Sequence, residues 1–311
     1  MKNRVDLIVV IPVGPRCNLT FVEDTIDSVY NFIYCRYKIV VIDDSQEGLG
    51  AKLKITFPDI DLITNPKSHG RWGGLYINLC KAYRYAIEHY HFDALLKLDT
   101  DALIIGSNPQ EEAIRLFKDN PNIGIAGLHY TDQSNTDFYG NKIDNSWPRK
   151  QLIKDTCTWK LIRRPVPNLT LRKYFFRAVR RGYQIGENVF GGSYFMSESL
   201  LLKMNSEGLL PDLRLRKVNL EEDHIFGILS RSLGFELGDL ASGDLPFGVA
   251  WLGLPAPPED LLKHDKKIVH STRKWGDMDE KAIRSFFKKQ RETQTGVMQF
   301  RLRQDLQAVG R

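Results

Sequence analysis

Short, continuous apolar runs in the first third of the chain constrain the fold most strongly. They occupy residues 7–13, 37–42 and 94–98, with a weaker run at 60–63. Runs of this kind are typical of strands buried on both faces of a parallel sheet. Apolar residues at helical spacing lie between them, at 20–34 and from Gly74 to about His89. The alternation predicts an α/β chain with a mostly parallel open sheet flanked by helices.

Local signals refine this outline. Thr20, with Glu23 three residues on, is expected to cap the first helix. Gly48 and Gly50 predict a loop, and Gly234 is expected at the C-cap of a helix that begins at 221. The remaining expectations are helices at 111–118, 169–182 and 277–292, a short helix after Ser197, a strand at 123–126 and a long loop at 130–150.

Composition excludes several classes of protein. A chain of 311 residues with 42% hydrophobic and 26% charged residues is neither disordered nor fibrous, and it allows one large or two ordinary domains. Its four cysteines form no C-x-x-C pair, which argues against a disulfide scaffold or a zinc knuckle. The sequence shows no signal peptide and no apolar run of the ~20 residues that a membrane helix needs. We therefore expect a soluble cytoplasmic protein.

Charge is distributed unevenly. Residues 149–186 contain eleven Lys or Arg residues and one acid, and residues 263–311 contain thirteen and six, although the net charge of the chain is only +6. Two basic segments on an acidic body suit an anionic partner such as a nucleotide, a membrane surface or nucleic acid. Two solvated helical faces would give the same pattern.

Acidic residues follow two of the predicted strands. Asp99-Thr-Asp101 comes directly after the 94–98 run, and two carboxylates at this spacing can bind Mg²⁺ or Mn²⁺. Asp43 and Asp44 follow the 37–42 run, where a carboxylate can accept hydrogen bonds from a ribose or a base. Solvated turns and helix caps are the structural alternatives at both places.

Further candidates lie elsewhere in the chain. Arg71, in the Gly-rich turn 70–74, could contact a phosphate, although neither a P-loop nor a dinucleotide fingerprint is present. Glu222 and Asp223 stand in an acidic helix start that favours the macrodipole and could also supply a general base. His270 could complete a metal site or be structural.

Taken in order, these motifs resemble the GT-A-type nucleotide-sugar glycosyltransferases, particularly the inverting family two. The resemblance covers about residues 5–272. It rests on a first strand ending in a proline, a second ending in acids, a Gly/Asn-rich helix start, the D-x-D, a Gly-Gly acceptor-site turn, a Glu-Asp pair and a late histidine. These are Val10-Ile-Pro-Val13, Ile42-Asp-Asp44, Gly73-Gly-Leu-Tyr-Ile-Asn78, Asp99-Thr-Asp101, Gly191-Gly192, Glu222-Asp223 and His270.

The resemblance implies a role for each matched residue. Asp101, with Asp99 and His270, would bind a divalent cation, Mn²⁺ or Mg²⁺. Asp223 would be the catalytic base, with Glu222 as the other candidate. Nucleotide-sugar contacts would come from Pro12, Gly14, Asp43, Asp44, Arg71, Asn78 and Asp99, and acceptor contacts from Gly191 and Gly192. The implied partners are a nucleotide-diphosphate sugar donor, with UDP favoured, and a glycan or lipid-linked acceptor.

The same comparison suggests a domain plan. Residues 1–272 would form a GT-A-like catalytic domain, with a nucleotide-binding half at 1–105 and an acceptor half at 106–272, followed by a helical tail at 273–311. The variable basic segment 130–186 would recognise the acceptor. The Gln-x-x-Arg-Trp motif of processive members is absent, since Arg273-Lys-Trp275 does not match it. This predicts transfer of single sugars in cell-surface glycan synthesis.

Two other functions fit parts of the sequence. A sugar-nucleotide nucleotidyltransferase has a similar sheet, but Gly14-Pro15-Arg16 is too short for its triphosphate loop. A non-catalytic basic module for membranes or nucleic acid would explain the 149–186 segment but not the acidic strand ends. We favour an enzyme whose helix near 169–182 docks on an anionic membrane at its inner face, with no nucleic-acid partner.

Overall fold

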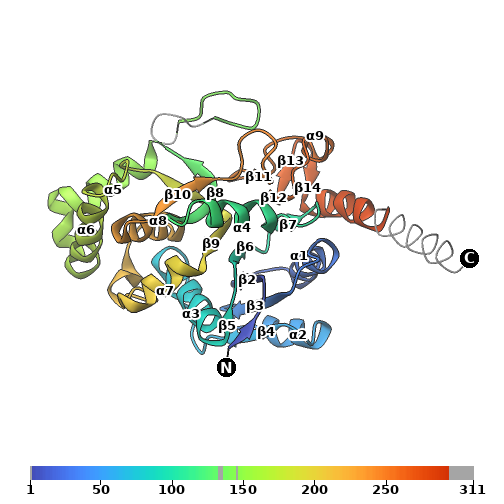
Figure 1. Cartoon of the computed structure of the whole chain (residues 1–311), viewed down its shortest axis with the longest axis horizontal. Helices are drawn as coiled ribbons and strands as arrows, with labels where there is room; N and C mark the ends of the chain where they lie inside the picture. Colours follow the sequence, from blue (N-terminus) through green and yellow to red (C-terminus); the bar gives the residue numbers. More distant parts are fainter. Residues whose placement is uncertain (1, 132–135, 145, 294–311) are drawn as a thin grey trace, which may run out of the picture.

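A central sheet divides the molecule into layers in the computed structural model, which describes residues 2–131, 136–144 and 146–293 (Figure 1). Within these residues the sheet has seven strands in the order β10-β8-β9-β6-β2-β3-β4. Only β9 among them runs antiparallel to its neighbours, β6 and β8. The prediction of a mostly parallel α/β sheet flanked by helices is therefore confirmed.

The helices are α1 (Leu19–Phe32), α2 (Leu49–Thr56), α3 (Gly73–His89), α4 (Gln110–Asp119), α5 (Trp147–Cys157), α6 (Pro165–Val179), α7 (Glu198–Ser206), α8 (Glu222–Leu233) and α9 (Pro258–Lys263), with short 3₁₀ turns η1 (Trp159–Arg163) and η2 (Leu213–Lys217). Residues 280–293 are also helical. The central strands are β2 (Leu7–Val13), β3 (Tyr37–Asp43), β4 (Asp61–Thr64), β6 (Ala94–Leu98), β8 (Ile123–Tyr130), β9 (Asn188–Ser197) and β10 (Glu236–Asp239).

Smaller strands complete the fold. β7 (Ala102–Ile104), β11 (Phe247–Val249) and β12 (Ile268–His270) form a second sheet in the order β11-β12-β7. β1 (Asn3–Arg4) pairs with β5 (Tyr90–His91), and β13 (Lys274–Trp275) pairs with β14 (Met278–Asp279). The second sheet matters for function because β7 begins directly after the D-x-D motif.

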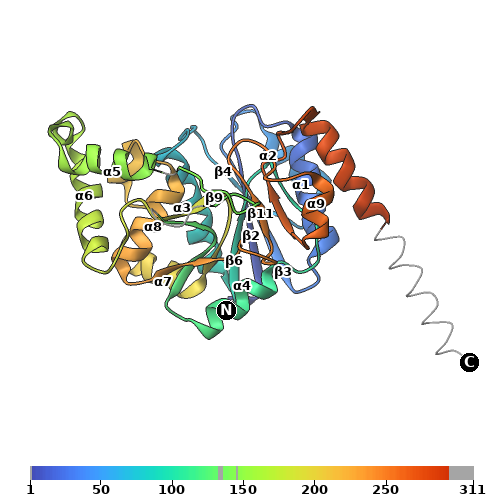
Figure 2. The ribbon, with the colours of Figure 1, turned by 90° about the horizontal axis from the view of Figure 1, so that it is seen from above.

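Alternate residues of each central strand face opposite sides of the sheet. Ile8 and Val10 pack with apolar side chains of α3, α6, α7 and α8. Leu7 and Val9 pack instead with α1, α2 and α4 on the other face. Because both faces are covered, these strands read as continuous apolar runs. Figure 2 shows α5 and α6 at one end of the molecule, and the 280–293 helix beside α1 at the other.

Three local predictions are wrong. Asn18, not Thr20, caps α1, because its side chain accepts a hydrogen bond from the Thr20 N–H. The segment expected as a loop around Gly48 and Gly50 contains α2, with Gly48 as its N-cap in the left-handed region. Gly191 and Gly192 lie inside the strand β9 rather than in a turn. The domain plan stays a prediction, and residues 294–311 of the tail lie outside the described residues.

Candidate active site

A cleft of about 170 Å³ opens where β6 ends. It brings together acids from the D-x-D segment and from the start of α8, glycines of β9 and the histidine that ends β12. Its lining residues are Leu75, Asp99, Asp101, Phe190, Gly191, Gly192, Glu221, Glu222, Asp223, Trp251, His270 and Arg273. Parallel α/β sheets bind ligands beyond the carboxyl ends of their strands, and this cleft lies there.

Strand pairing brings His270 to the D-x-D motif. β7 pairs antiparallel with β12, and His270 is the register partner of Ala102, the residue after Asp101. His270 Nε2 therefore lies 3.4 Å from Asp101 Oδ1, while its Nδ1 lies 2.9 Å from the carbonyl oxygen of Ala250. Asp101 and His270, which are 169 positions apart in the sequence, thus become neighbours through the register of one short strand pair.

Gly192 makes room for the imidazole. A Cβ atom built on Gly192 would lie 2.6 Å from Cε1 of His270, so no larger residue fits without moving that ring. Gly191 is similarly close to the acid pair, since its Cβ would lie 3.1 Å from Glu222 Oε1. The two glycines thus allow β9 to pass directly beneath the histidine and the acids.

Lys97 is a fully buried cation behind the cleft. Its Nζ lies 2.7 Å from Asp99 Oδ1 and 3.3 Å from Glu222 Oε1, and it also donates to the Gly191 carbonyl. A buried charge is tolerated only when it is paired and hydrogen-bonded. Burial alone would lower the pKa of Lys97, but Asp99 and Glu222 raise it above its usual value, so the lysine stays charged.

Asp101 is held as a carboxylate. Burial would raise its pKa, but hydrogen bonding and charge from His270, together with Arg273 and Ser271, hold the pKa well below its usual range. Arg273 Nε lies 2.8 Å from Oδ2, and Ser271 Oγ donates to the same oxygen over 2.9 Å. Asp101 is therefore ionised at every physiological pH.

The other acids of the cleft hold protons more strongly. Burial raises the pKa of Asp99 to about 6, although Lys97 opposes the shift. Burial likewise raises the pKa of Asp223 to about 6, against hydrogen bonds from the His224 N–H and the Asn188 side chain. Carboxylates with raised pKa values in a cleft are candidates for acid–base chemistry near neutral pH.

Asp99, Asp101 and His270 fit a divalent cation. Each offers one ligand atom, and these three atoms lie within 4.8 Å of one another. Two carboxylate oxygens and an imidazole nitrogen form a donor set that suits Mn²⁺ or Mg²⁺ completed by ligand and water oxygens. Glu221, Asp223 and His224 form a second such group.

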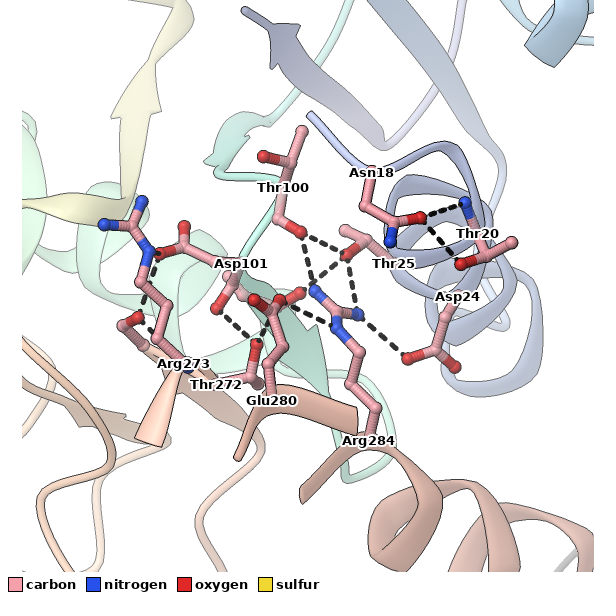
Figure 3. A network of polar contacts seen from close by, with 12 residues as sticks. Asn18, Thr20, Asp24, Thr25, Thr100, Asp101, Thr272, Arg273, Glu280 and Arg284 are labelled. Carbon is pink, nitrogen blue, oxygen red and sulfur yellow. Dashed lines mark hydrogen bonds and ion pairs between the residues drawn. The ribbon is translucent and has the colours of Figure 1, made fainter. Parts of the chain in front are cut away.

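A buried network ties the D-x-D segment to the chain's last described helix (Figure 3). Arg284 donates to the Thr100 carbonyl oxygen over 2.7 Å and pairs with Asp24 of α1 at 2.9 Å. Thr272 Oγ1 donates to the Asp101 carbonyl oxygen over 3.0 Å. These contacts hold the backbone carbonyl groups of Thr100 and Asp101, in the segment that carries two of the candidate cation ligands.

Asp43 and Asp44 do not line this cleft. Asp43 accepts from the backbone N–H groups of Ser45 and Gly50, so it caps the start of α2. Asp44 accepts from Ser68 Oγ and the His69 N–H, which orders the loop before α3. β3 is separated from β6 by β2, which places both acids two strands from the D-x-D motif.

The other predicted donor contacts are also dispersed. Pro12 lies in β2 opposite Ile42, and Gly14 follows that strand. Asn78 is buried in α3 and accepts from Asn65 over 2.7 Å. Arg71 lines a different cavity, beside Trp72. Their roles in donor binding stay predictions.

Sequence reasoning missed Lys97, Arg273 and Arg284. Lys97 had a visible signal, because it is a charged residue inside an otherwise apolar strand, two positions before Asp99. Arg273 and Arg284 had none, since each meets Asp101 or Thr100 only through the tertiary fold. Among the described residues, no helix is long and apolar enough to cross a bilayer.

Comparison with known proteins gives structural neighbours only. No family model matches the sequence, and no curated protein matches it. The mannosyltransferase PcManGT from Pyrobaculum calidifontis, solved with GDP-Man and Mn²⁺, is 17% identical; 77% of this chain and 55% of that one are covered, with a TM-score of 0.45. The bifunctional glycosyltransferase WbbM is 12% identical. The match covers 94% of this chain and 50% of WbbM, with a TM-score of 0.49. The chain thus spans about half the length of these proteins.

Proposed function

We propose that this protein is a glycosyltransferase that moves a single sugar from a nucleotide-diphosphate sugar to an acceptor hydroxyl. The observation that carries the proposal is the convergence of a cation-binding set, Asp99, Asp101 and His270, with the buried Glu222-Asp223 pair in one cleft. Metal-dependent inverting transfer uses these two functions side by side: a cation for the departing diphosphate and a base for the attacking hydroxyl.

The chemistry divides between the cation and the chain. Asp99, Asp101 and His270 would hold Mn²⁺ or Mg²⁺, which supplies positive charge to the departing diphosphate. Arg273, whose side chain is largely exposed beside Asp101, adds a second positive charge at the same edge. Lys97 lies behind both halves of the site and fixes the position of the Asp99 carboxylate relative to Glu222.

Asp223 is the better candidate for the base. Burial raises the pKa of Glu222 although Lys97 opposes the shift, and the ion pair with Lys97 holds one of its carboxylate oxygens away from a substrate. Asp223 instead accepts hydrogen bonds from the His224 N–H at 2.7 Å and from Asn188 Nδ2 at 3.2 Å, which orient its carboxylate beside Gly191. A base with a pKa near 6 is ionised at neutral pH and still takes up a proton readily.

Space limits where the donor can lie. The cleft of about 170 Å³ is smaller than the ~300–1,000 Å³ of typical ligand pockets, so the nucleotide has to extend beyond it. A neighbouring cavity of about 410 Å³ shares Asp101 and Arg273 with the cleft and is also lined by Pro15 and Arg16. We place part of the donor there, next to the segment that follows β2.

The finer features of the proposal rest on the sequence motifs. We propose inversion, a UDP-linked hexosyl or hexosaminyl donor, non-processive transfer and a role in cell-surface glycan synthesis. Contacts of Asp43, Asp44 and Asn78 with the nucleotide, and of Gly191 and Gly192 with the acceptor, belong to the same proposal. Peripheral contact of α6 with an anionic membrane at the cytoplasmic side is part of it as well.

One experiment tests the reaction type. The chain is titrated calorimetrically with UDP- and GDP-sugars in the presence of Mn²⁺, and slow donor hydrolysis is followed by NMR of the anomeric proton. Binding that requires Mn²⁺, with release of nucleoside diphosphate, supports the proposal. Failure of every common nucleotide sugar to bind at millimolar concentration contradicts it. Release of pyrophosphate from a nucleoside triphosphate and a sugar phosphate would instead favour a nucleotidyltransferase.

A further inference from the structure

A second, strongly basic cavity lies beside the start of α3. It measures about 600 Å³ and is lined by cations and by apolar side chains, namely Arg71, Trp72, Arg164, Pro165, Val166, Pro167, Arg216, Lys217 and Val218. Three separate segments supply the four cations: the turn before α3, the start of α6 and η2. The cleft chemistry does not use these charges.

The four cations lack acidic partners. No acidic side chain lines the cavity, and Arg71, Arg164, Arg216 and Lys217 form no ion pair with a carboxylate within the described ranges. Arg164 Nη1 donates to the Lys217 carbonyl oxygen over 3.1 Å, which joins two of the three segments. The positive charge reaches beyond the cavity, since burial together with Lys81 and Arg216 lowers the pKa of His69.

The shape of the cavity depends on Gly73. A Cβ atom at this position would lie 2.6 Å from the Arg216 carbonyl oxygen, so a glycine is needed for η2 to approach the start of α3 this closely. Trp72, just before it, has a φ of 59°, an unusual backbone conformation for a large side chain. This conformation accompanies a 40% exposed indole on the cavity wall, with the Arg71 guanidinium 5.4 Å from the ring centroid.

The cavity and the carboxylate cleft meet at the first turn of α3. Trp72 lines the basic cavity, and Leu75, three residues further on, lines the cleft. Only three positions of chain at the start of α3 separate these two lining residues. On this ground we let a ligand in the basic cavity extend toward the cleft that Asp223 lines.

We propose that this basic cavity binds a phosphorylated carbohydrate, with the phosphoryl group among Arg164, Arg216 and Lys217 and a sugar ring against Trp72. Guanidinium groups bind phosphate oxygens through paired hydrogen bonds. The inference rests on the proposed function in one respect: it makes this ligand the acceptor, whose hydroxyl lies in the cleft. In this arrangement Arg71 contacts the acceptor and not the donor.

The test measures binding without activity. Glucose 1-phosphate, inorganic phosphate and glucose are each titrated calorimetrically into the full chain in EDTA, at low and high NaCl. Vesicles containing phosphatidylglycerol are tested by sedimentation. The pocket variant is Arg164→Gln/Arg216→Gln. The matched control is Arg172→Gln/Arg180→Gln, which removes the same charge from exposed positions of the same basic segment outside the cavity.

We expect glucose 1-phosphate to bind more tightly than inorganic phosphate, glucose not to bind, and affinity to fall with salt. The pocket variant should weaken binding at least tenfold and the control less than twofold. Equal losses in both variants, equal binding of phosphate and glucose 1-phosphate, or binding of vesicles alone would overturn the proposal. Lys217→Gln serves as a single substitution if the double variant unfolds.

A parallel titration with UDP and Mn²⁺ separates this inference from the proposed function. The pocket variant should keep the donor affinity of the unmodified chain. If UDP and every common nucleotide sugar fail to bind with Mn²⁺ while glucose 1-phosphate binds, the glycosyltransferase assignment fails and the phosphate site stands. If the pocket variant loses UDP binding as well, the cavity belongs to the donor and the inference fails.

Discussion

The ammonium group of Lys97 lies 2.7 Å from the carboxylate of Asp99, and no part of the lysine side chain reaches solvent. The same ammonium group is 3.3 Å from Glu222, so one buried cation offsets acids from two distant segments. Without it, the candidate cation site and the candidate base would face each other as uncompensated negative charge.

Replacing this lysine should destabilise the fold and the site together. Lys97→Met leaves Asp99 and Glu222 without their buried partner, and loss of one member of a buried ion pair costs about 3 kcal/mol or more. Urea unfolding followed by circular dichroism should show this loss. Lys52→Met, at an exposed position of α2, should leave the midpoint almost unchanged. A Lys97→Met protein as stable as the parent would contradict the role given to this charge.

Cation affinity should depend on Asp101. Asp101→Asn keeps the size of the side chain but removes one ionised ligand, so Mn²⁺ binding measured by electron paramagnetic resonance should weaken at least tenfold. EDTA should abolish sugar transfer, and added Mn²⁺ should restore it. Asp119→Asn, at the exposed end of α4, is the control and should bind Mn²⁺ like the parent. Unchanged affinity in Asp101→Asn would remove the cation site from this cleft.

The pH dependence of transfer should report Asp223. Its pKa is raised to about 6, and a base works only when deprotonated, so kcat/KM should rise as pH increases through 6 and level off above pH 7. At saturating Mn²⁺, which keeps the Asp99 carboxylate ionised, the rate at pH 5 should be about tenfold below the plateau, since one pH unit below the pKa leaves about a tenth of Asp223 ionised. Asp223→Asn should lower kcat about 10²–10⁴-fold and remove this slope. A steep slope that survives in Asp223→Asn would assign the titration to another group.

Gly192 should be intolerant of a single methyl group. In Gly192→Ala the new Cβ would displace the His270 ring, which separates the imidazole from Asp101. We expect weaker Mn²⁺ binding, a slower reaction and a lower unfolding midpoint, since overpacking a buried site costs about 1–3 kcal/mol. Gly227→Ala, in α8, is the matched control, because the nearest atom to a Cβ there, Leu237 Cδ1, lies at an ordinary contact distance of 3.7 Å. Equal behaviour of the two alanine variants would show that the close contact does not position the histidine.

The sequence predicts the strands of the first half of the fold well because each strand is buried on both faces. Such burial leaves an apolar run that can be read directly, as in residues 7–13 and 94–98. The helix α2 was not predicted, because glycines at 48 and 50 are typical of a loop. In the structure Gly48 is the N-cap of the helix, and Gly50 allows the Asp43 side chain to approach the first turn closely. The turn predicted at Gly191 and Gly192 was wrong for the same reason. These glycines lie in β9 and allow the strand to pack closely against His270 and the Glu222-Asp223 pair.

The candidate site was predictable only in part. The position of Asp99 and Asp101 follows from the end of one strand, which is a local property. The approach of His270 depends on the register between β7 and β12, and that of Arg284 on the docking of a helix against α1. Neither leaves a periodic signal. Asp43 and Asp44 illustrate the opposite case, because the same strand-end pattern there serves to order backbone N–H groups.

Arg284 links segments that are far apart in the sequence, since its guanidinium group joins Asp24 to the carbonyl oxygen of Thr100 (Figure 3). Contacts of such high sequence separation form late and slow the folding of a chain. A cation that binds only the folded cleft would stabilise the folded state. The melting temperature of the protein should then rise with the cation concentration. A melting temperature that rises with Mn²⁺ would therefore show that the cation binds the folded cleft and not the unfolded chain.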